Sequence, residues 1–179
     1  MNINFYEILN QISNSPSKKE KQSILLQYAS PLLKQFLSLA FHPDIRFYPS
    51  SFPEGYKEPD TLPGISFSTL PCELKRLYLF QIGNETADSL TIEKRNNLLL
   101  QLLESLEPAE AQTLINLFNK DLKTKGLTYS LIKETFPNLL PWKRNYLNSQ
   151  TSIQLNLKRR KNQNSILKMI PLEKIRNIS

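Results

Sequence analysis

Cysteine, histidine and glycine are scarce in this sequence. There is one cysteine, Cys72, one histidine, His42, and only four glycines among 179 residues. A single cysteine cannot form an internal disulfide, and these counts exclude every metal site built from several cysteines or histidines. The glycines are scattered and form no glycine-rich phosphate loop. We therefore expect no cofactor and no metal, and a reducing, cytoplasmic setting.

Long hydrophobic runs are also missing. No run approaches the roughly 18 apolar residues that cross a membrane, and the N-terminus lacks the basic and apolar segments of a secretory signal. We therefore expect no membrane partner. Apolar residues still make up 40% of the chain, which is enough to fill a core and predicts a globular body.

Excess positive charge is confined to one end of the chain. Residues 142–179 contain nine lysines and arginines but one acid, a net charge of +8, whereas residues 1–141 have 14 basic and 15 acidic residues, a net of −1. This division predicts a nearly neutral body, residues 1–141, and a basic C-terminal arm, residues 142–179. We expect the arm to be poorly ordered by itself.

Apolar residues recur at helical spacing along most of the body. The pattern predicts an all-α fold of about seven helices, one of which runs from Leu70 to about Ile82. Residues with capping side chains, or a proline at the first helical position, mark the predicted helix starts: Ser17, Ser30-Pro31, Thr91, Glu107-Pro108 and Thr128. The helix that begins at Thr128 must end before Pro137.

Residues 43–66 interrupt the helical pattern with five prolines that alternate with aromatic residues. We predict an extended, ordered crossing whose aromatic rings hold it against the helices. Two interpretations are open, because so long a loop either covers the core or forms a functional surface.

Three further features of the body could be mistaken for reactive or ligand-binding groups. His42 stands between Phe41 and Pro43 with no arranged acid or nucleophile, so we predict that it ends a helix. Cys72 falls early in an apolar helix and is predicted to be a small buried residue. Glu104, Glu107 and Glu110 are three residues apart and are predicted to form a solvated face.

Two stretches of the body carry a resemblance to known proteins. The first comprises residues 7–12, 17–25 and 32–48, and the second comprises residues 117–122, 125–128 and 132–141. Together they resemble the N-terminal helical DNA-binding domain of phage-type ATP-dependent DNA ligases. They resemble still more closely a family of short tailed-phage proteins that carry this domain alone. The most specific piece is Lys-Gly-Leu-Thr followed by Phe-Pro-Asn-Leu-Leu-Pro, and the match spans about residues 5–141.

The residues around this piece suit an element that faces phosphate. Gly126 permits a tight turn, and a helix that begins after Thr128 presents free N–H groups there. The resemblance implies that such an element approaches the DNA backbone, with this role assigned to Lys123, Lys125, Gly126, Thr128 and Ser130. The alternative is that Gly126 ends one helix, Thr128 caps the next, and the lysines are merely solvated.

The chain also departs from the ligases. It has no Lys-x-Asp-Gly motif, and the 38 residues after Pro141 are too few for a nucleotidyltransferase domain. We therefore expect no ligation, no other enzymatic activity and no small-molecule substrate. The near-neutral body also lacks the excess positive charge that duplex binding needs, so binding must depend on the arm.

The arm has three alternative roles. It could bind nucleic acid, DNA or RNA, in the cytoplasm of an infected host cell; it could bind a host or phage protein; or it could have no specific role. The residues predicted to contact nucleic acid are Trp142, Lys143, Arg144, Lys158, Arg159, Arg160 and Lys161. Trp142 could stack on a base, and the four-residue basic run could contact phosphates.

Overall fold

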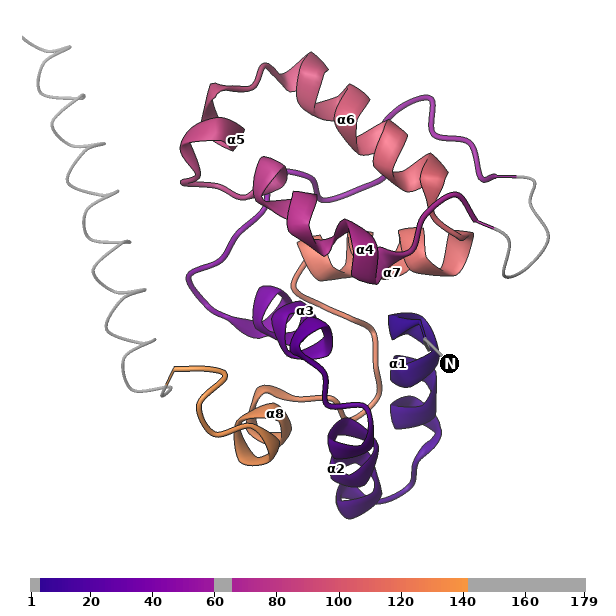
Figure 1. Ribbon diagram of the computed structural model, residues 1–179, viewed down its shortest axis with the longest axis vertical. Helices are drawn as coiled ribbons and strands as arrows, with labels where there is room; N and C mark the ends of the chain where they lie inside the picture. Colours follow the sequence, from indigo (N-terminus) through magenta and orange to yellow (C-terminus); the bar gives the residue numbers. More distant parts are fainter. Residues whose placement is uncertain (1–3, 60–65, 142–179) are drawn as a thin grey trace, which may run out of the picture. The chain divides into compact units, whose positions relative to one another are not determined.

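A computed structural model describes residues 4–59 and 66–141 (Figure 1). Within these residues the chain forms eight α-helices and one 3-10 helix and no strand, so the all-α prediction is confirmed. The helices are α1 (Phe5–Asn14), α2 (Lys18–Gln27), α3 (Pro31–Phe41), α4 (Leu70–Glu73), the 3-10 helix η1 (Leu74–Phe80), α5 (Glu85–Ser89), α6 (Ile92–Ser105), α7 (Pro108–Phe118) and α8 (Tyr129–Thr135). No helix of the described residues is long and apolar enough to cross a membrane.

The predicted caps start the helices as expected. Ser17 Oγ accepts a hydrogen bond from the Glu20 amide at 3.2 Å, and Ser30 Oγ accepts one from the Leu33 amide at 3.1 Å. Thr91 and Thr128 cap α6 and α8 in the same way. These serine and threonine side chains satisfy amides that the first helical turn leaves without partners. At the other end of α3, His42 follows the last helical residue, as predicted.

The region from Leu70 to Ile82 differs from the single helix that was predicted. One turn of α-helix, α4, passes into the tighter η1, which ends at Phe80. The carbonyl of Phe80 accepts a hydrogen bond from the Tyr48 amide at 2.9 Å, so the end of η1 is paired with the crossing. The short helix α5, which Asn84 caps, was not predicted.

Aromatic rings hold the crossing against the helices. The Phe47 ring is buried with its centroid 4.7 Å from that of Phe118 in α7, and Phe52 stacks on Tyr56 at 4.6 Å. The Ile82 amide donates to the carbonyl of Arg46 at 2.8 Å. These contacts give the described part of the crossing, residues 43–59, a role in covering the core.

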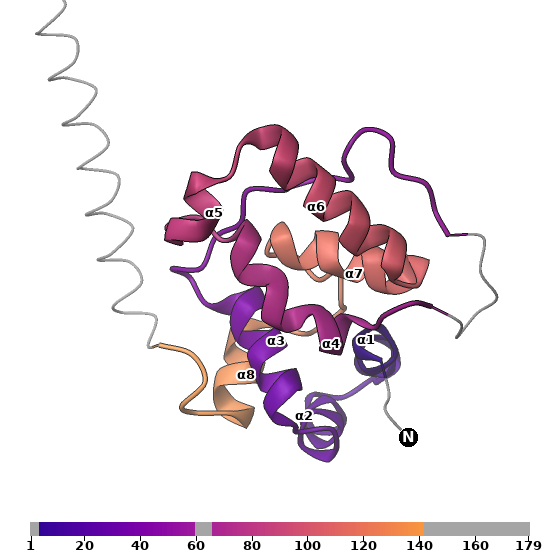
Figure 2. The ribbon, with the colours of Figure 1, turned by 45° about the horizontal axis from the view of Figure 1, so that its top comes forward.

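Helix α7 is the centre of the body. It contacts α1, α3, α4 and α6, and its apolar side chains lie in one continuous core. In two views α2 and α8 lie at one end of the body, whereas α5 and α6 lie at the other (Figures 1 and 2). Helix α2 packs against both α1 and α8, which brings the N-terminal segment beside the last helix of the body.

Two predictions about single side chains are wrong. Glu110 is fully buried, because its carboxylate reaches from α7 to α4 and accepts a hydrogen bond from the Leu70 amide at 3.1 Å. Burial raises the pKa of Glu110 to about 7. Cys72 is exposed, because Leu70 and Glu73 take the buried positions of the short turn α4.

Candidate functional site

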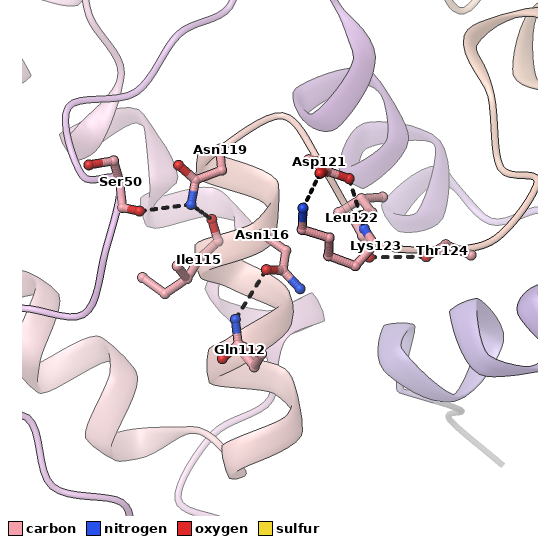
Figure 3. Close-up of polar contacts among 9 residues, drawn as sticks. All are labelled: Ser50, Gln112, Ile115, Asn116, Asn119, Asp121, Leu122, Lys123 and Thr124. Atoms are coloured by element: carbon pink, nitrogen blue, oxygen red, sulfur yellow. Dashed lines mark hydrogen bonds and ion pairs between the residues drawn. The ribbon is translucent and has the colours of Figure 1, made fainter.

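The loop that joins α7 to α8 carries most of the residues predicted to face phosphate in the body. It begins with Asn119, whose side chain donates to the carbonyl of Ser50 at 2.7 Å and so fastens the loop to the crossing (Figure 3). Lys120 and Lys123 both have left-handed backbone conformations, with φ of 60° and 54°. Such conformations are uncommon for residues other than glycine, and here local hydrogen bonds hold them.

Lys123 is exposed but is paired with an acid. Its ammonium pairs with the Asp121 carboxylate, and its amide donates to the same carboxylate at 3.1 Å (Figure 3). The hydrogen bond from the Lys123 side chain holds the pKa of Asp121 below its usual value. The positive charge that Lys123 offers to a ligand is therefore already balanced by a neighbour.

Lys120 has a structural role. Its ammonium donates to the carbonyls of Leu39 at 2.6 Å and His42 at 3.0 Å, and so closes the C-terminal end of α3. Burial, with a smaller effect of Arg46, lowers the pKa of Lys120 to about 8. This lysine joins the loop to α3 rather than facing outward.

The end of the loop and the start of α8 form one side of a pocket of about 310 Å³. Its lining residues come from α2, the loop and α8: Lys18, Lys21, Gly126, Thr128, Ser130 and Leu131. The structure thus brings together three of the five body residues that the resemblance assigned to phosphate. Lys123 and Lys125 do not line the pocket. Sequence reasoning missed the two lysines of α2 that line the pocket, Lys18 and Lys21, which had no signal beyond the resemblance.

Lys21 forms the floor of the site. It is only 7% exposed, and its ammonium donates to the carbonyl of Ile12 and to that of Lys125, the latter at 3.1 Å. Gly126 has φ of 78°, and a Cβ placed there would lie 2.9 Å from Cε of Lys21. The left-handed conformation therefore favours glycine, and a side chain at this position would also displace the end of Lys21.

Gly126 belongs to the turn that leads into α8. The Leu127 amide donates to the Thr124 carbonyl at 3.2 Å across this turn. The entry turn is confirmed, and the alternative that Gly126 ends a helix is wrong, because α7 ends at Phe118. The N-cap half of that alternative is confirmed, because Thr128 Oγ1 accepts from the Leu131 amide at 3.3 Å.

Lys18 stands at the rim of the pocket, beside an acid of α8. Its ammonium lies 2.6 Å from a carboxylate oxygen of Glu134, and their side chains are 60% and 48% exposed. The Gln22 side chain donates to the same oxygen at 3.4 Å. These contacts link α2 to α8 across a solvent-exposed surface.

Lysines and hydroxyls in this arrangement can bind an anion. No group of three or more metal-ligating histidine, cysteine or acidic side chains occurs in the described part of the chain. The seven predicted residues of the arm, from Trp142 to Lys161, lie outside the described residues.

Comparison with known proteins places the chain by its sequence. A search of curated proteins found no match. A family described as "Family of unknown function (DUF6433)" matches residues 8–124, more than half of the chain. The matched region runs from α1 into the loop after α7, so it includes Lys18 and Lys21 and stops before Gly126. The chain belongs to this family of unknown function.

Proposed function

We propose that the protein binds nucleic acid without catalysing a reaction. In this proposal the basic arm supplies electrostatic attraction and the helical body supplies shape. The observation that carries it is the division of charge, +8 in residues 142–179 against −1 in residues 1–141. A basic segment that neutralises phosphates releases their counterions, which is a favourable and sequence-independent source of affinity.

The resemblance to the DNA-binding domain of phage ligases supports the same role and suggests its setting. We propose a tailed-phage accessory protein that acts on DNA or RNA in the cytoplasm of an infected host cell. The body would contribute the segment from Gly126 to Ser130 and the lysines beside it. Trp142 would stack on a base, while Lys143, Arg144 and the basic run at 158–161 would contact phosphates.

The charges of the body explain why the arm should dominate. Lys123 is paired with Asp121 and Lys18 with Glu134, so each of these lysines must exchange a carboxylate for a phosphate. Such an exchange between exposed groups contributes about 0–1 kcal/mol. The arm has a single acid among its charges, and its cations offer larger attraction.

The test compares the full chain with a chain that ends at Pro141. Affinity for a labelled duplex is measured by fluorescence anisotropy at several salt concentrations between about 50 and 200 mM. We expect the full chain to bind with strong salt dependence and the shortened chain to bind much more weakly. Equal and salt-insensitive affinities would refute the role of the arm, and absence of binding by both would refute the function.

A second candidate function is interaction with a host or phage protein. The observation that favours it is the exposure of large apolar side chains on a nearly neutral body, including Phe67 at 89% and Ile92 at 74%. A pull-down from infected cells, repeated after nuclease treatment, separates the two functions. Partners that persist after nuclease support a protein target, and partners that disappear support nucleic acid.

A further inference from the structure

The pocket between α2 and α8 combines an exposed cation with an acid already bound to it. The Lys18 ammonium and the Glu134 carboxylate are 2.6 Å apart, and each side chain is about half exposed. Neither group belongs to a buried hydrogen-bond network, so solvent screens the attraction between the two charges. An ion pair of this kind can exchange partners at little cost.

The interior of the pocket carries a second positive charge that cannot move away. Lys21 lines the pocket and is 7% exposed. An ammonium has three N–H donors, and two of those on Lys21 bind the carbonyls of Ile12 and Lys125. One donor remains, and no carboxylate among the described residues pairs with Lys21. The buried charge therefore favours an anion in the pocket.

The remaining lining residues add two hydroxyl groups, those of Thr128 and Ser130, to a surface that is otherwise largely apolar. Ser130 contributes a hydroxyl to the lining, and the absence of a side chain on Gly126 lets the end of Lys21 lie against that residue. The Thr128 hydroxyl accepts the cap bond from the Leu131 amide, so its proton stays available for donation. A tetrahedral oxyanion can accept hydrogen bonds from several such donors at once.

We propose that this pocket binds a phosphate group through Lys18 and the hydroxyls, and that Glu134 is an internal competitor which holds Lys18 until phosphate displaces it. The inference rests on the proposed nucleic-acid function where the phosphate comes from a nucleic-acid backbone. Free phosphate is the other source of the same chemistry. Because Glu134 must be displaced, an isolated phosphate gains less than one delivered by a polyanion that the arm also holds.

The first experiment measures duplex affinity and its salt dependence for full-length variants. Glu134→Gln frees Lys18 and should tighten binding by up to about fivefold. Lys18→Gln removes the cation and should reduce the slope of log affinity against log salt by about one. If the two residues act as a pair, Glu134→Gln has no effect on affinity when Lys18→Gln is also present.

Matched controls change the same charges elsewhere on the body. Glu93→Gln and Lys94→Gln alter two exposed neighbours in the first turn of α6. This helix lies at the other end of the body from α2 and α8 (Figures 1 and 2). Glu93→Gln reports what the loss of one negative charge does to affinity at a distance. A Glu134→Gln effect no larger than that of Glu93→Gln, or one that persists with Lys18→Gln, would overturn the role of Glu134.

The second experiment titrates inorganic phosphate into the full chain and into Lys18→Gln, with amide NMR as the readout. We expect shifts of the Gly126–Leu131 amides in the wild type and much smaller shifts in the variant. Duplex binding without these shifts and without the Glu134 effect refutes phosphate binding in the pocket but supports the proposed function. Pocket shifts without duplex binding refute the proposed function and assign the pocket to free phosphate. Absence of both refutes both.

Discussion

The buried acid Glu110 makes the stability of the fold depend on pH in an unusual direction. One carboxylate oxygen accepts from the Leu70 amide at 3.1 Å, and the other is buried without a hydrogen-bond partner in the described structure. Burial raises the pKa of Glu110 from 4.5 to about 7, with a smaller contribution from Glu107 and Glu7. The folded chain therefore holds the proton at pH values where the unfolded chain has lost it.

The magnitude follows from the shift. The pKa rises by roughly 2.5 units, and at 1.36 kcal/mol per unit this amounts to about 3 kcal/mol. Since the folded-state pKa is the higher one, this stability is complete below about pH 4.5. It falls as the pH rises towards 7, and it is lost above that value.

The substitution Glu110→Gln removes the titration and keeps an oxygen for the Leu70 amide. We expect the free energies of unfolding of wild type and variant to be similar near pH 4.5. At pH 8 the variant should be more stable by up to about 3 kcal/mol, because it buries no charge. Urea denaturation followed by circular dichroism at five pH values measures both curves.

A control keeps the overall charge change but moves it to the surface. Glu104→Gln neutralises an exposed acid near the end of α6, and its difference from wild type should vary little with pH. The reasoning is refuted if the stability difference between wild type and Glu110→Gln is the same at pH 4.5 and pH 8.

Three other predictions test the packing around the site. Gly126→Ala should lower the free energy of unfolding by about 1–3 kcal/mol, because it combines a left-handed φ with displacement of Lys21. Gly83→Ala has the same backbone conformation but open space, so thermal denaturation should show a cost of only about 1 kcal/mol; equal losses would contradict the contact with Lys21. For Lys120 the folded pKa of about 8 is below that of the unfolded chain, so stability should rise with pH between about 8 and 10.5. Urea denaturation of Lys120→Met should show a smaller rise, and parallel curves would contradict the burial of that charge.

The sequence predicted the helices whose signals are local. Serine and threonine caps, a proline at the first helical position and apolar periodicity act within one or two turns, and they placed the starts of α2, α3, α6 and α8. Helix α5 has five residues, too few to show a period, and was missed. The 3-10 geometry of η1 accompanies pairing with Tyr48, a contact distant in sequence.

The candidate site was predicted only in part, because its members come from separate segments. Gly126, Thr128 and Ser130 are close in sequence and could be grouped by a resemblance. Lys18 and Lys21 join them only because α2 packs against α8, which no local pattern reveals. Glu110 was misjudged for a similar reason, since its partner is the amide of Leu70, 40 residues away in the chain.

The central claim is that the arm supplies the electrostatic affinity for nucleic acid. The most direct measurement replaces Lys158, Arg159, Arg160 and Lys161 with glutamine in the full chain and records duplex affinity against salt concentration. Each phosphate contact contributes about 0.9 to the slope of log affinity against log salt, so the slope should fall by up to about 3.6. An unchanged slope and affinity would contradict the account.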